Sequence, residues 1–175
     1  MSHIELPTWL RALLPAAPSA LVCPATATDR TVVDVAMIFP GQRIVDSDAA
    51  RACVAGILLA RDRFHDSHAV SQDLATAEGS YWHGILHRRE PDAGNAKYWM
   101  RQVGRHPVHV GLAAATRQLG AERLLDRGAW NAVRFIDACT ASGGDDRQAE
   151  ILSAVQAKEM ELLLAWCAAK AVGAG

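Results

Sequence analysis

The sequence lacks the features that mark several common classes of protein. Its 18 lysines and arginines balance 19 aspartates and glutamates, which argues against a globally basic nucleic-acid-binding protein and against an acidic tail. The apolar runs reach only about half of the ~20 residues that a membrane span needs, so we expect no contact with a membrane. The four cysteines form no CxxC pair, which favours reduced thiols in a cytoplasmic protein. A phosphate-binding loop, a dinucleotide fingerprint and a GxSxG elbow are also missing.

A chain of 175 residues that is 50% hydrophobic is typical of one folded domain. Five of the seven prolines fall within residues 1–45, where the apolar residues follow no regular spacing. We therefore expect a proline-rich N-terminal arm that packs on the body, with a short helix near residues 4–14 and an extended segment at 31–39. Residues 46–175 are expected to form a single all-α domain.

Apolar residues three and four positions apart predict a helical bundle in this second part of the chain. Candidate capping residues, prolines and glycines divide it into helices at residues 46–64, 79–90, 96–103, 107–119 and 130–140, and a last helix that begins at 145 or 146. No alternation of strands and helices occurs, so the predicted fold class is all-α. The last helix is expected to run for about 25 residues, long enough to pair with a second copy in a homodimer.

Side chains that can carry chemistry are concentrated between residues 65 and 109. Six of the seven histidines and both tyrosines lie in this stretch, together with many charged residues. The helices predicted on either side of this stretch are mainly apolar and are expected to serve a structural role. We therefore expect a polar pocket in this region.

The segment SYWHGILHRREPDAGNAKYW at residues 80–99 resembles the signature YWHxIxHRREPDxxNAKYW of an uncharacterised bacterial protein family. The resemblance extends more loosely over residues 48–170 and leaves out the proline-rich arm. This family has no established activity, cofactor or catalytic residue, so the resemblance implies no chemistry for the chain. The chemistry must be argued from the residues themselves.

A metal site is predicted at His83 and His87, with His68 as a further ligand. His83 and His87 are four residues apart on a predicted helix, which places their Cβ atoms about 5–6 Å apart on one face. HExxH metal sites use this spacing, but Gly84 stands here in place of the glutamate. These ligands suit zinc, iron, manganese or nickel. Other candidate ligands are His65, Asp66, Glu78 and Glu161. Alternatively, the two histidines are hydrogen-bonded groups of a polar core.

A site for a small anionic ligand is predicted next to these histidines. Guanidinium groups bind carboxylate and phosphate through two parallel hydrogen bonds, which favours arginine in such sites. Lys97 and Arg101 share a helix face that follows the turn after Arg89. The predicted ligand-binding residues are Arg88, Arg89, Asn95, Lys97, Tyr98 and Arg101. As an alternative, Glu90 and Asp92 pair with two of these arginines inside the chain.

Two functional hypotheses follow from these sites. In the first, a His- and Arg-rich pocket at residues 65–109 binds a small anionic molecule, with or without a divalent metal, and an enzyme would use that metal for hydrolysis or redox chemistry. In the second, the protein is a non-catalytic interaction or dimerisation module, and the HRREPD and NAKYW motifs form a structural hydrogen-bond clamp. The sequence does not decide whether the protein is an enzyme.

Overall fold

The computed structural model describes residues 5–16, 20–22, 31–142 and 145–174, and this part of the chain is all-α with one small hairpin. This confirms the predicted fold class. The elements are α1 (Thr8–Arg11), α2 (Val35–Ile38), α3 (Ser47–Ala60), α4 (Phe64–Gln72), α5 (Ala77–Arg89), α6 (Ala93–Val103), α7 (Val108–Gln118), the 3-10 turn η1 (Glu122–Leu124), β1 (Leu125–Asp126), β2 (Ala129–Trp130), α8 (Ala132–Ala141) and α9 (Asp146–Val172).

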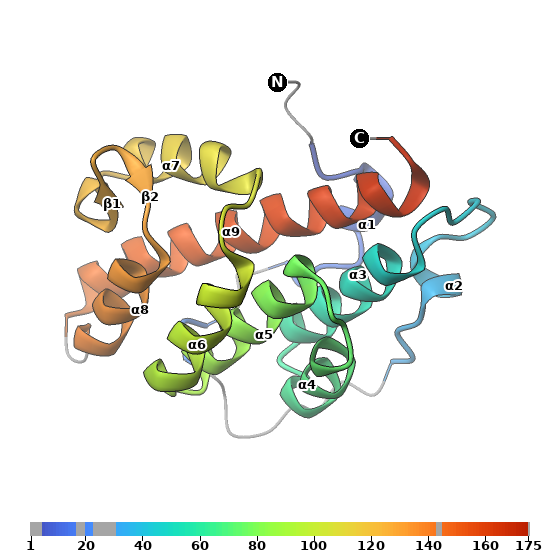
Figure 1. Ribbon diagram of the computed structural model, residues 1–175, viewed down its shortest axis with the longest axis horizontal. Coiled ribbons are helices and arrows are strands. Elements are labelled where there is room, and N and C mark those ends of the chain that lie inside the picture. The colour runs from blue at the N-terminus through green and yellow to red at the C-terminus, as the bar shows by residue number, and fades with distance from the viewer. Residues whose placement is uncertain (1–4, 17–19, 23–30, 143–144, 175) are drawn as a thin grey trace.

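The long helix α9 runs across the molecule and the other helices gather around it (Figure 1). Helices α3 and α7 pack directly against α9. The Asp145 side chain caps its first turn by accepting a hydrogen bond from the backbone N–H of Gln148, 3.0 Å away. Its last turn ends at Gly173, whose φ of 73° is a left-handed conformation that favours glycine. The 27 residues between these caps agree with the length expected from the sequence.

Side-chain caps account for where most of the other long helices begin. Each cap accepts a hydrogen bond from a backbone N–H three residues further on, which satisfies one of the donors that a first turn leaves unpaired. These caps are Asp46 for α3, Thr76 for α5, Asp92 for α6 and Asn131 for α8. The prediction of one helix over residues 46–64 was wrong at its end. Asp62 has a φ of 59°, so the chain turns after α3 and starts α4 at Phe64.

The N-terminal arm is only partly as predicted. Residues 17–19 and 23–30 lie outside the described part of the chain. The helix near residues 4–14 is present as the single turn α1. The extended segment expected at 31–39 was wrong, because Asp34 caps Met37 N and starts the short helix α2. Side chains of both short helices enter the main hydrophobic core, including Leu10 and Ile38.

Helix α5 lies at the centre of the molecule although its sequence is polar. Every residue from Glu78 to Arg89 is buried. Neighbouring helices α3, α4 and α6 pack against it, and Trp82 faces α3 with its ring against Gly56. Its charged and imidazole side chains must therefore find partners inside the protein, because an unpaired buried polar group costs free energy.

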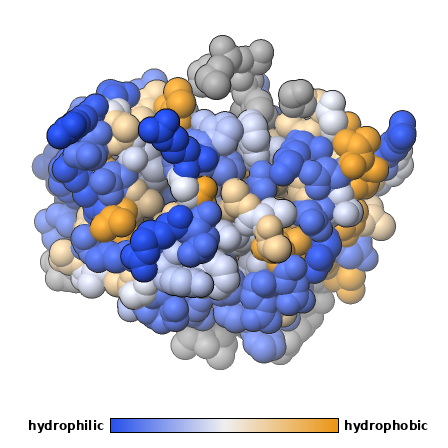
Figure 2. Space-filling model, in the orientation of Figure 1, coloured by the Kyte–Doolittle hydropathy of each residue, from blue (hydrophilic) through white to orange (hydrophobic). Residues whose placement is uncertain are grey.

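The surface is consistent with a chain that keeps its apolar residues inside. The face shown in Figure 2 is largely hydrophilic, with small separate hydrophobic patches. Among the described residues, no helix combines the length and the apolar character that crossing a membrane requires.

Candidate metal centre

Three imidazoles meet between α4 and α5. His68, His83 and His87 each offer one ligand nitrogen, and these three atoms all lie within 4.8 Å of one another. The His68 ring centroid is 4.5 Å from that of His83 and 5.6 Å from that of His87. These are the three residues predicted as metal ligands. The structure thus supplies the proximity that a shared metal ion needs.

The local fold explains why the three side chains converge. His83 and His87 are one helical turn apart on α5, and their rings stack with centroids 4.8 Å apart. His68 comes from α4, which packs alongside α5 and is tied to α3 by a hydrogen bond from Ser67 Oγ to the Ala55 carbonyl, 2.9 Å long. Trp99 of α6 also stacks on His83, with a centroid distance of 4.1 Å and an interplanar angle of 15°.

Burial keeps two of these imidazoles in their neutral form. His83 is 2% exposed and His87 is 9% exposed, whereas His68 is half-buried. Burial, reinforced by the neighbouring His68 and His87, lowers the pKa of His83 to about 4. A neutral imidazole has a free lone pair for a metal ion. Moreover, the Nδ1 atom of His83 is buried and has no hydrogen-bond partner among the described residues.

Glu90 lies behind His87, on the first residue after α5. Its Oε2 atom is 3.2 Å from Nδ1 of His87. Burial lowers the pKa of His87, and the Glu90 charge opposes that shift without cancelling it. A carboxylate on one nitrogen of an imidazole orients the ring and makes the other nitrogen a better metal ligand. If Glu90 holds Nδ1 of His87 in this way, a metal ion would bind at Nε2.

The structure places the four other candidate ligands away from this cluster. His65 is exposed on α4. Asp66 pairs with Arg63 at 2.6 Å. Glu161 on α9 pairs with Arg11 and Lys158, at 2.6 and 3.1 Å. None of these side chains belongs to the group of three histidines that the described residues form.

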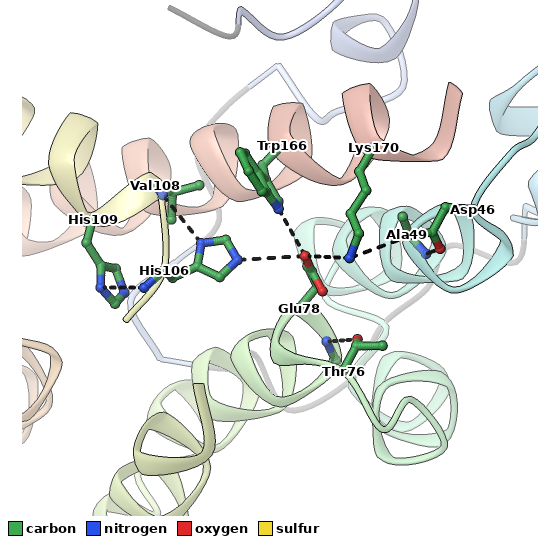
Figure 3. Close-up of polar contacts among 10 residues, drawn as sticks. Asp46, Ala49, Thr76, Glu78, His106, Val108, His109, Trp166 and Lys170 are labelled. Carbon is green, nitrogen blue, oxygen red and sulfur yellow. Dashed lines mark hydrogen bonds and ion pairs between the residues drawn. The ribbon is translucent and has the colours of Figure 1, made fainter. Parts of the chain in front are cut away.

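Glu78 is the buried centre of a separate polar network (Figure 3). Its Oε1 atom accepts hydrogen bonds from Trp166 Nε1 at 2.9 Å and from Lys170 Nζ at 3.1 Å. The Nε2 atom of His106 lies 3.9 Å from the same oxygen. Burial by itself would raise the pKa of Glu78, but the bonds from Trp166 and Lys170 lower it overall. The carboxylate therefore ties the start of α5 to α9.

The sequence did not predict this network, because no motif or spacing indicates it. Its members come from α5, from α9 and from the residues just before α7, so no spacing along the chain brings them together. The Tyr81 ring lies against both His106 and His109, with centroids 5.5 and 5.6 Å away. Burial and the neighbouring His106 lower the pKa of His109 to about 4.

The two arginines of the predicted anion site point to different sides of α5. Arg88 donates from Nη2 to Glu159 Oε2 at 2.6 Å and to Gln156 Oε1 at 3.3 Å, both on α9. Arg89 donates to Asp62 and to the carbonyl of Leu59, at the end of α3. Both arginines pair with carboxylates on other elements, whereas the alternative placed Glu90 and Asp92 as partners of two arginines of the region.

The remaining residues of that site do not join the arginines. Asn95 donates to Asp92 Oδ2 at 2.8 Å. Lys97 forms an ion pair with Asp137 on α8. Tyr98 is 48% exposed and Arg101 is also exposed. The structure thus disperses the six predicted ligand-binding residues over several contacts, and an anion site built from them stays a prediction.

No family model, curated protein or solved structure matches the chain. The resemblance of residues 80–99 to a bacterial family therefore stays a prediction. What the protein does has to be argued from the geometry of its buried polar groups.

Proposed function

We propose that the protein binds one divalent transition-metal ion through His68, His83 and His87. The observation that carries the proposal is the meeting of three imidazole nitrogens within 4.8 Å, with two of the rings buried. Imidazole is a ligand common to zinc, iron, nickel and copper, and zinc accepts sites made of histidine alone. We therefore expect zinc or a metal of similar preference.

The geometry requires little rearrangement for metal binding. Two nitrogens bound to one tetrahedral zinc ion at 2.0–2.1 Å are about 3.4 Å apart. The three histidines, separated by up to 4.8 Å, would need to close by roughly 1.5 Å at most. Rotation of the three side chains would have to supply this movement, against the packing of His83 on Trp99 and His87. The position of Glu90 behind His87 supports the same proposal, because metal-bound histidines usually have such an outer partner.

The clamp of the second hypothesis has support of its own, and it is compatible with a metal. Arg88 ties α5 to α9 and Arg89 ties α5 to the end of α3. Both ion pairs hold in place the helix that carries His83 and His87. The small-molecule ligand, the homodimer and the cytoplasmic location of the protein stay predictions.

The test is elemental analysis of the purified, untagged protein after incubation with zinc, iron(II) or manganese(II) and removal of excess metal. We expect about one metal ion per chain in the wild type. We expect little metal in His68→Ala and in the double variant His83→Ala/His87→Ala. The matched control is His65→Ala, which removes an exposed histidine one turn from His68 on the same helix. Circular dichroism shows whether each variant is folded.

Two results would contradict the proposal. One is a wild-type protein that retains none of the three metals. The other is a folded His68→Ala variant that binds as much metal as His65→Ala, because surface histidines would then account for the binding.

A further inference from the structure

We propose, resting on the function proposed above, that the bound ion keeps an open coordination position and takes a small monodentate anion from solution there. The ligand class is hydroxide from bound water, azide or a simple carboxylate. This inference concerns the ion's fourth ligand, which the three histidines leave undefined.

The described part of the chain supplies three donors at this place. Among the described residues, no fourth histidine, cysteine, aspartate or glutamate joins the group. The two carboxylates whose charges act on the pKa of His87, Glu90 and Asp92, have other contacts. Glu90 faces Nδ1 of His87, on the side of the ring away from its Nε2 atom, and Asp92 caps α6 through the backbone N–H of Asn95. Structural zinc sites are closed by four protein ligands, whereas sites with three protein ligands take water or substrate as the fourth.

The charge of the donor set favours an anion in that position. Imidazole binds a metal ion in its neutral form, so three histidines leave the full charge of a divalent ion uncompensated. The low dielectric around the buried His83 and His87 strengthens the attraction between that charge and an anion. The positive charge of the ion also stabilises hydroxide, so a water molecule bound to such an ion loses a proton near neutral pH.

The surroundings show from which side the anion would arrive. Trp99 covers one face of His83, and both His83 and His87 are buried. Of the three ligands, only His68 is partly exposed. The open position is therefore reached beside His68, along α4.

Cobalt(II) substitution followed by azide titration tests this inference. Cobalt binds zinc sites, and its visible absorption depends on the number and kind of its ligands. We use the full-length protein loaded with one equivalent of cobalt and add sodium azide, with sodium perchlorate at equal ionic strength as the control for salt. We expect a saturable spectral change that fits one azide per cobalt and no change with perchlorate. The His65→Ala variant should respond as the wild type does.

The possible failures separate this inference from the proposed function. Stoichiometric cobalt binding with a spectrum that azide does not alter would overturn the open position and leave the three-histidine site standing. Failure to bind cobalt at all would overturn both. An azide response that persists unchanged in folded His68→Ala protein would also overturn the inference, because the responding ion would then lie elsewhere.

Discussion

The Nη2 atom of Arg88 lies 2.6 Å from Oε2 of Glu159, and these side chains are only 1% and 0% exposed. The guanidinium also lies over the ring of Phe135, 4.2 Å from its centroid. Burial by itself would lower the pKa of Arg88, but the Glu159 charge raises it, so the arginine stays protonated. A fully buried ion pair of this kind costs much to break, since the charge left behind has no water around it.

Removing either partner of this pair should strongly destabilise the protein. For Glu159→Leu and for Arg88→Met we expect the free energy of unfolding to fall by about 3–5 kcal/mol. The double variant should lose clearly less than the sum of the two, because it leaves no unpaired charge. Urea denaturation followed by circular dichroism measures this. As a control, Asp126→Ala breaks the exposed pair with Arg134 and should cost less than about 1 kcal/mol. An equal loss of unfolding free energy on breaking the buried and the exposed ion pair would contradict this expectation.

Gly56 of α3 packs closely against Trp82 of α5. A Cβ atom placed there would lie 2.5 Å from Cζ2 of Trp82, a fully buried ring. For Gly56→Ala we expect a net loss of about 1–2 kcal/mol, because overpacking outweighs the gain in helix propensity. The matched control is Gly94→Ala on α6, where the nearest atom is 3.5 Å away. Thermal unfolding should show a lower Tm for the first variant only, and an unchanged Tm in both would refute the close contact.

Glu90 acts, in the proposed metal site, as a positioning residue for His87. For Glu90→Ala we expect zinc affinity to fall about 10- to 100-fold, because the ring of His87 loses its orienting carboxylate. Competition with a chromophoric chelator measures the affinity. Glu90 is exposed, so the stability of the metal-free protein should change little. Glu150→Ala, at an exposed site on α9, should bind zinc as the wild type does. Equal affinities in the two variants would exclude the positioning role.

The stability of the metal-free protein should fall as the pH drops from about 6.5 towards 4. The pKa values of His83 and His109 are lowered from 6.5 to about 4 in the folded state, so between these values the unfolded chain binds more protons. Each histidine then contributes a slope of up to about 1.4 kcal/mol per pH unit. Urea denaturation between pH 5 and 7 measures the slope. Near pH 5, His109→Gln should reduce the slope by close to one proton. An unchanged slope in that variant would contradict the assignment.

The sequence allowed the helices to be predicted because helix formation depends on neighbours along the chain. The capping residue Asp46 and the apolar spacing of the last helix led to the correct starts of α3 and α9, whereas α6 begins at Ala93, three residues before the predicted start. Sequence reasoning was wrong where the chain conformation depends on distant contacts. The end of α3 is an example, because Asp62 there turns the chain and pairs with Arg89.

The sequence by itself determined that His83 and His87 share one face of a helix, since that follows from the period of the α-helix. It could not determine that this helix is buried on all sides. Only the tertiary structure decided that His68 lies beside the pair and that Arg88 forms an ion pair with Glu159. The same holds for Glu78, which accepts hydrogen bonds from Trp166 and Lys170. The physical reason is that these partners are 15 or more residues apart along the chain, and helix packing alone brings them together.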